Sequence, residues 1–193
     1  PLLIRRLVNL DLEKKPALRF SRDMFLLSFY LRGIPFVDLV HLRKTDVKHN
    51  TIYYYRHKTR QQLSVHIESY AAQIINRYKN EAASSPYLLL ILSLTGEDGY
   101  RQYKSALRLY NQHLHTLSKM LRLSIPLTSY VARHSWATTA KDEGVAISVI
   151  SESLGHTSEK VTHVYLASFD NNAMSKANKK VIATIHPNKK KKP

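Results

Sequence analysis

Residues 21–42 read SRDMFLLSFYLRGIPFVDLVHL, and this stretch predicts a buried helix followed by a second helix. A serine and an aspartate at its start favour helix initiation, and the almost wholly apolar run that follows is typical of a buried helix. Gly33 interrupts the run, and Pro35 suits the first turn of a second helix. We therefore expect two consecutive helices, at 21–31 and 35–42.

The next segments predict a hairpin. TIYYYR at 51–56 and QLSVHI at 62–67 are rich in β-branched and aromatic residues, and five residues, HKTRQ, separate them. Two such runs joined by a short connection are typical of antiparallel strands. This pattern places Lys58 at the turn.

The rest of the chain predicts helices. Apolar residues recur at helical spacing in 69–79 and again in 102–121. Three more helices are expected in TSYVARHSWATTAKDEG, ISVISESLG and TSEKVTHVYL, two of them closed by Gly144 and Gly155. The predicted fold class is therefore mainly α with a small antiparallel β-hairpin, an α+β domain.

The composition predicts a polyanionic partner. Lys and Arg total 30 against 14 Asp and Glu, which gives a formal net charge of +16 and a pI of about 10.0. Solubility alone requires far less charge, and nucleic acid is the simplest polyanion that would balance it. No apolar run approaches the roughly 18 residues that a membrane-spanning helix needs, which argues against membrane residence.

Several kinds of chemistry are excluded by composition. The chain has no cysteine, so it has no disulfide, no thiolate nucleophile and no zinc site built on cysteine, which fits a reducing intracellular compartment. Its five glycines form neither GxxxxGK nor GxGxxG, and its ten histidines form no HExxH motif. We therefore expect no metal, no ATP and no other cofactor.

A few residues meet the demands of DNA strand cleavage without metal or ATP. That reaction needs a nucleophile, cations for the non-bridging phosphate oxygens and an acid for the departing sugar oxygen. Arg133, in YVARHSWAT, offers a planar fork of donors suited to phosphate, and Lys58 offers one mobile ammonium group. His156 in LGH and Tyr165 in VTHVY follow Arg133 at intervals of 23 and 9 residues. Each alone would more often be a surface cation, a turn histidine or a packing aromatic.

Taken together, RHSWAT, LGH, VTHVY and the hairpin lysine in HKT resemble the tyrosine recombinases, or phage-integrase family, over nearly the whole chain. The sequence FLLSFYLRGIPFVDLVHL also resembles sequences of the integrases of bacterial mobile elements. The resemblance implies the tyrosine recombinase catalytic-domain fold. It also implies a site-specific recombinase that cleaves and rejoins DNA without metal or ATP, to integrate or excise a mobile element.

The resemblance also assigns roles. Tyr165 would attack a DNA phosphodiester, form a 3′-phosphotyrosine linkage and free a 5′-hydroxyl. Arg133 would hold the non-bridging oxygens, and His156 would hydrogen-bond the phosphate and assist proton handling. Lys58 would protonate the leaving 5′-oxygen. The phenol's reference pKa near 10 makes it a poor nucleophile until nearby cations favour the phenolate.

Two positions depart from the family pattern. Pro35 occupies the slot of the family's first arginine, and a proline side chain binds no phosphate. We expect Arg32 to supply the missing cation, with Arg43 as a weaker candidate; the alternative is that Arg32 caps the preceding helix. Tyr130 stands where the family usually has histidine, three residues before Arg133. It would either donate a hydrogen bond to phosphate or pack in the core.

The chain divides into three expected segments. Residues 1–20 are a linker from an N-terminal core-binding domain, 21–185 the catalytic domain, and 186–193 a basic tail. The resemblance implies double-stranded DNA as partner, a homotetramer on DNA in which a helix near 179–185 docks on a neighbour, and accessory DNA-bending or excision factors. It implies a cytoplasmic, nucleoid-associated protein.

Two other functions remain open on sequence alone. AISVISESLGHTSEKVTHVYL also parses as a helix-turn-helix, so a non-catalytic DNA-binding protein would satisfy the charge equally well. That interpretation does not account for Lys58 and Arg133 far upstream. A type IB topoisomerase would share the phosphotyrosine chemistry but would relax supercoils.

Overall fold

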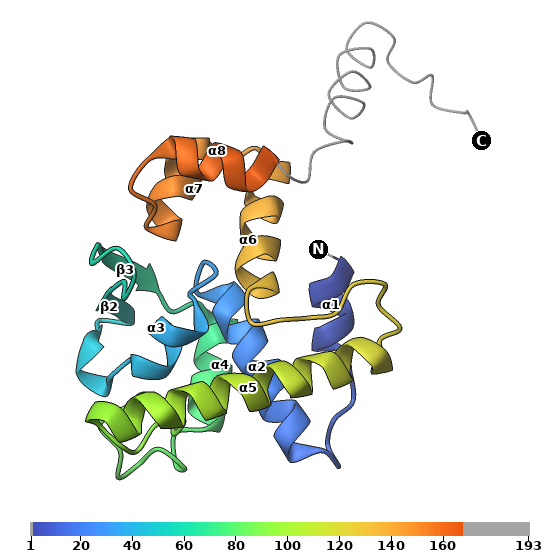
Figure 1. Ribbon diagram of the computed structural model, residues 1–193, viewed down its shortest axis with the longest axis vertical. Helices are drawn as coiled ribbons and strands as arrows, with labels where there is room; N and C mark the ends of the chain where they lie inside the picture. The colour runs from blue at the N-terminus through green and yellow to red at the C-terminus, as the bar shows by residue number, and fades with distance from the viewer. Residues whose placement is uncertain (1, 168–193) are drawn as a thin grey trace, which may run out of the picture.

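The computed structural model describes residues 2–167 of the 193-residue chain (Figure 1). Within this part the protein is mostly helical and carries one small antiparallel sheet, so the predicted fold class is confirmed. The elements are α1 (Leu2–Val8), α2 (Pro16–Tyr30), α3 (Phe36–His41), a 3₁₀ turn η1 (Lys44–Asp46), β1 (Val47–Lys48), β2 (Thr51–Tyr55), β3 (Gln62–His66), α4 (Ser69–Arg77), α5 (Gly96–Met120), α6 (Val131–Asp142), α7 (Ile147–Leu154) and α8 (Glu159–Ala167).

Helix α2 is the central element, and it begins earlier than the sequence predicts. Pro16 opens the helix, where its missing N–H costs no hydrogen bond. The predicted start at Ser21 is wrong, because Ser21 and Asp23 lie buried inside the helix. Asp23 is satisfied there by an ion pair with Arg77 at 2.6 Å and by the hydroxyl of Tyr78, which donates to it at 2.6 Å.

The main core surrounds α2. This helix packs against α4, α5 and α6, and the long helix α5 runs across the molecule beside it (Figure 1). Helix α1, within the range 1–20 that the sequence interpretation treats as a linker, adds Ile4 and Leu7 to the same core. Among the largest side chains sealed in this core are Met24, Phe25, Leu27, Leu39 and Leu114.

The sheet has the order β1-β2-β3 and is antiparallel throughout. Its side chains alternate between buried and exposed along β2 and β3, as expected for a sheet with one face on the core. The hairpin and its turn at Lys58 agree with the sequence prediction, whereas the two residues of β1 are too few to show a periodic pattern. The turn is closed by the Arg56 N–H, which donates to the Gln61 carbonyl at 2.9 Å.

The last three helices form a second, smaller core. Ala137, Ile150, Leu154 and Leu166 are its buried members. Figure 1 shows α7 and α8 together at the end of α6. Gly155 ends α7 in the left-handed region at φ 63°, as the sequence predicts.

Two predictions on the C-terminal end of the chain fall outside the described residues. Helix 179–185 and the basic tail 186–193 both lie there. Across residues 2–167, no helix combines the length and apolarity needed to cross a membrane.

Gly33 lies where the α2–α3 turn meets α6. It has φ +71°, and a Cβ built on it would lie 2.7 Å from the Cα of Arg133 on α6. No side chain fits between the α2–α3 turn and α6 at this point. The absence of a side chain at residue 33 therefore sets how closely α6 approaches α2.

Gly33→Ala should lower the free energy of unfolding by about 2–4 kcal/mol, because left-handed strain and overpacking against α6 add together. Gly144→Ala is the matched control, since Gly144 has φ +81° with nothing within 4 Å of its built Cβ. It should cost only about 1–2 kcal/mol, the strain alone. Urea unfolding measures both, and equal losses would contradict the close approach at Gly33.

Candidate active site

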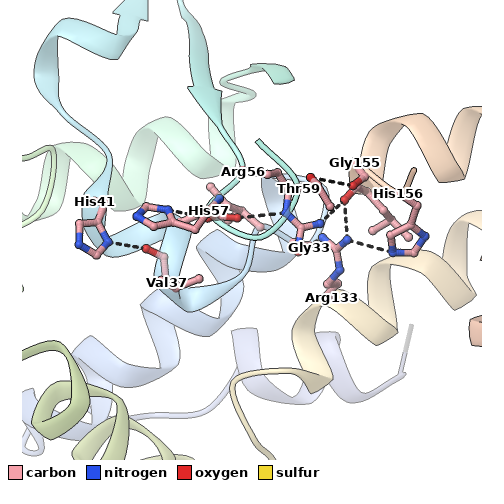
Figure 2. Close-up of polar contacts among 12 residues, drawn as sticks. Gly33, Val37, His41, Arg56, His57, Thr59, Arg133, Gly155 and His156 are labelled. Atoms are coloured by element: carbon pink, nitrogen blue, oxygen red, sulfur yellow. Dashed lines mark hydrogen bonds and ion pairs between the residues drawn. The ribbon is translucent and has the colours of Figure 1, made fainter. Parts of the chain in front are cut away.

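Arg133 is the buried centre of the site. Its side chain projects from α6 and the residue is only 2% exposed. Nη1 donates to the Gly33 carbonyl at 3.0 Å, and Nη2 donates to the Leu154 carbonyl at 2.5 Å (Figure 2). Nη2 also lies 3.3 Å from Nε2 of His156. One guanidinium therefore links the α2–α3 turn to the C-terminal end of α7.

His156 follows directly on that helix end. Its Nδ1 lies 2.8 Å from Oγ1 of Thr162, a fully buried residue of α8. Because a guanidinium has donors only, Nε2 accepts from Arg133, and Nδ1–H then donates to Thr162. Burial, and then the positive charges of Arg133, Arg56 and Lys58, lower the pKa of His156 to about 4. The imidazole is therefore neutral at pH 7.

Tyr165 of α8 lies among three rings. Its ring packs edge-on against Tyr130 at 5.9 Å between centroids, against His134 at 5.4 Å and against His156 at 5.9 Å. Burial, followed by the phenol of Tyr130, raises the pKa of Tyr165, and the positive charge of Arg133 opposes that rise only in part. The phenol is thus protonated at neutral pH, and it lies within the electric field of Arg133.

Lys58 reaches the site through the hairpin turn. The turn is attached to the end of α7, because the Thr59 hydroxyl donates to the Gly155 carbonyl at 3.3 Å (Figure 2). Lys58 itself is exposed, and its charge contributes to the lowered pKa of His156. The structure therefore brings together four predicted residues that lie up to 107 positions apart in the sequence, from Lys58 to Tyr165.

The two residues that are predicted to stand in for family residues, Tyr130 for a histidine and Arg32 for the first arginine, lie in different places. Tyr130, at the start of α6, is 54% exposed and packs on Tyr165, so it lies at the surface of the site and not in the core. Arg32 follows α2 at φ 57°, and its Nη1 donates to the carbonyl of Ser64 on β3 at 3.4 Å. Within residues 2–167, no hydrogen bond joins Arg32 to Arg133. Its predicted role stays a prediction.

The weaker candidate, Arg43, lies elsewhere. It is the N-cap residue of η1, and its guanidinium carbon is 5.9 Å from the ring centroid of Tyr87. Pro35 caps α3 at its N-terminus, close to the predicted position. In the part of the chain that the structure covers, no cluster of three or more His, Asp or Glu could hold a metal ion.

Arg56 is a cation at the site that the sequence interpretation missed. It is 7% exposed, its Nη1 donates to the Leu154 carbonyl at 2.5 Å, and its Nε forms an ion pair with Oδ2 of Asp38 at 3.3 Å. An arginine at the end of a strand is usually a surface residue. One signal was available: Asp38 lies in the short apolar helix FVDLVH, and a buried carboxylate requires a cationic partner.

The phage integrase family model matches residues 7–172. The chain belongs to the phage integrase family. The tyrosine recombinase XerA of Thermococcus kodakarensis is 28% identical to it over 166 residues, which are 84% of this chain and 56% of XerA. The chain thus spans little more than half the length of this curated relative.

Solved structures show the fold. A crystal structure of XerA recombinase matches 89% of this chain and 64% of its own, with 18% identity and a TM-score of 0.58. XerH bound to palindromic difH substrate, in a post-cleavage complex, matches 91% and 49%, with 14% identity and a TM-score of 0.66. The Tn1549 transposon integrase with transposon right end DNA matches 92% and 61%, with 13% identity and a TM-score of 0.60. The predicted tyrosine recombinase catalytic-domain fold is confirmed.

Acid should destabilise the protein through His156. A folded-state pKa near 4, below the usual 6.5, means that the unfolded chain binds more protons between these values, so stability falls as pH drops through this window. His156→Gln should show a shallower fall between pH 6.5 and 4 in urea unfolding. His163→Gln, at an exposed position on α8, should follow the wild type. Parallel curves for His156→Gln and wild type would contradict the lowered pKa.

Proposed function

We propose that this chain is the catalytic part of a site-specific DNA recombinase that cleaves and rejoins strands through a 3′-phosphotyrosine intermediate. The observation that carries the proposal is the convergence of Lys58, Arg133, His156 and Tyr165 from four separate segments. Membership of the phage integrase family supports the same reaction class.

The proposed reaction begins with Tyr165. Its phenol oxygen attacks the scissile phosphorus, a P–O bond to tyrosine forms, and the P–O5′ bond breaks. Neutral His156, whose ring packs against Tyr165, accepts the phenol proton on Nε2 once the bound phosphate replaces that nitrogen as the acceptor for Arg133. One phosphodiester replaces another, so the bond energy is retained and rejoining needs no ATP.

The cations of the site stabilise charge during that exchange. Arg133 presents fixed donors to the non-bridging oxygens, where negative charge accumulates in the transition state. Lys58, on the exposed hairpin turn, donates a proton to the departing 5′-oxygen. Tyr130, at the surface beside Tyr165, donates a hydrogen bond to the same phosphate. These donors stabilise the negative charge that the phosphate gains as Tyr165 attacks.

Double-stranded DNA is the proposed partner. The net charge of +16 favours a polyanion, and the structures of XerH and of the Tn1549 integrase are both complexes with DNA. We further propose a homotetramer on two duplexes, integration or excision of a mobile element, accessory DNA-bending or excision factors, and action on DNA in the cytoplasm. Residues 21–185 are the proposed catalytic domain.

The nucleophile is tested by covalent trapping. A nicked duplex carrying the DNA that borders the gene should form a protein–DNA adduct on a denaturing gel in the presence of EDTA. Tyr165→Phe should form none, because it lacks the attacking oxygen. Tyr100→Phe, at an exposed tyrosine of α5, should form it normally.

The same assay distinguishes the alternatives. An adduct that persists in Tyr165→Phe would exclude Tyr165 as the nucleophile. Absence of any adduct with wild-type protein would favour a DNA-binding protein without catalysis. Recombinant junctions in the products indicate a recombinase, and relaxed circles alone would indicate a topoisomerase.

The acid is tested by changing the leaving group. Lys58→Ala should slow cleavage of ordinary DNA by about 10²–10⁴-fold. It should recover on DNA with a sulfur in place of the scissile 5′-bridging oxygen, because a thiolate departs without a proton. Lys48→Ala, at an exposed lysine of β1, should cleave both substrates normally. If Lys58→Ala were equally slow on both substrates, Lys58 would not be the acid.

A further inference from the structure

We propose that Arg56 supplies the second phosphate-binding guanidinium of this site, in place of the arginine that Pro35 cannot provide. The inference rests on the proposed recombinase function and names a further catalytic residue for it. Asp38 acts as its positioning residue. The guanidinium enters the site from the hairpin, whereas its carboxylate partner stays on α3.

The first support is shared geometry. Arg56 Nη1 and Arg133 Nη2 each donate to the same Leu154 carbonyl oxygen at 2.5 Å (Figure 2). The two guanidiniums therefore meet at one point, two residues before His156. Two planar forks at one point can each engage a different non-bridging oxygen of one phosphate.

The second support is excess positive charge. Arg56 has one carboxylate partner, Asp38, and within residues 2–167 no ion pair joins Arg133 to any carboxylate. Burial, and then the charge of Arg56, lower the pKa of Arg133 to about 10, so Arg133 remains a cation at neutral pH and is repelled by the neighbouring guanidinium of Arg56. A bound phosphate would relieve this repulsion, because it places negative charge between them.

The third support is that the surroundings fit the Arg56 side chain. Gly155 lies beside it with φ +63°, and a Cβ built there would come within 3.0 Å of the Arg56 Cδ. Asp38, which is 2% exposed, binds two consecutive residues of the hairpin with its two carboxylate oxygens. Oδ2 pairs with Arg56 Nε at 3.3 Å, and Oδ1 accepts the backbone N–H of His57 at 2.9 Å. The hairpin turn that carries Lys58 is therefore held by the same carboxylate.

Arg32 is the rival for this role. Its Nη1 donates to the Ser64 carbonyl on β3 at 3.4 Å, whereas Arg56 and Arg133 both donate to the Leu154 carbonyl. Both arginines lower the pKa of Tyr54, so both are near the hairpin, but the lowering by Arg56 is the larger. The geometry favours Arg56 as the residue that contacts phosphate.

The test replaces the charge on the substrate. A nicked duplex with a methylphosphonate at the scissile position, in both diastereomers, carries no negative charge on that phosphate and so needs one cation fewer. Arg56→Ala should cleave the ordinary diester at least about 100-fold more slowly than wild type. It should recover most of that loss on one methylphosphonate diastereomer. Arg101→Ala, at an exposed arginine of α5, is the matched control and should cleave the diester at a near-normal rate. Arg32→Ala is measured beside it as the rival.

Each result decides between roles. If Arg56→Ala were equally slow on both substrates, or normal on the diester, the proposal would be overturned. If Arg32→Ala were slow and recovered on methylphosphonate, Arg32 would be the missing cation. If wild-type protein formed no adduct on the ordinary diester, the proposed function would fail and this inference with it. A wild-type adduct together with normal cleavage by Arg56→Ala would overturn the inference alone.

Two further variants separate catalysis from folding. Arg56→Gln keeps a donor for the Leu154 carbonyl without the charge, and it decides by the same substrate comparison if Arg56→Ala fails to fold. Asp38→Asn weakens the ion pair, so it should slow diester cleavage less than Arg56→Ala does and recover on the same methylphosphonate. A purely structural Asp38 would slow cleavage of both substrates equally.

Discussion

The buried guanidinium of Arg133 is the interaction on which the rest of this structure depends. A buried charge is costly unless hydrogen bonds satisfy it, and Arg133 finds its acceptors in two backbone carbonyls, those of Gly33 and Leu154. These carbonyls belong to different parts of the fold. Satisfying one side chain therefore fixes α6 against the α2–α3 turn and fixes the end of α7 against α6. His156 is positioned as a consequence, because it follows that helix end.

The site combines a concentration of positive charge with a phenol, that of Tyr165, which stays protonated at neutral pH. Arg56 and Arg133 share one acceptor, and only Asp38 balances them among the described carboxylates. Meanwhile burial keeps the Tyr165 phenol protonated and His156 neutral. Donors held in place before the substrate arrives need no reorganisation during the reaction, which is how such groups lower a barrier. The arrangement therefore suits the binding of an anion, whose negative charge would balance the second guanidinium.

Sequence reasoning succeeded where local patterns are strong. Apolar periodicity predicted most helices, and alternating β-branched and aromatic residues predicted the hairpin. It failed at boundaries and short elements. α2 begins at Pro16 because tertiary burial tolerates Ser21 and Asp23 inside a helix, and β1 is too short to carry a pattern. The motif spacing also predicted Arg133, His156 and Tyr165 as one group, and the structure brings the three together, since their relative positions follow from consecutive helices.

The sequence by itself determined the basic charge of this protein and its lack of cysteine, and it predicted a nucleophile, an acid and a phosphate-binding arginine in recognisable motifs. Only the tertiary structure shows which arginine lies beside Arg133, and so which one we propose in place of the arginine missing at Pro35. Arg56 and Arg32 are both arginines near a turn, and no local pattern distinguishes them. Burial and direction do, because one side chain reaches the Leu154 carbonyl beside Arg133 and the other reaches Ser64. Convergence of side chains from distant segments is a property of packing, and packing has no one-dimensional signature.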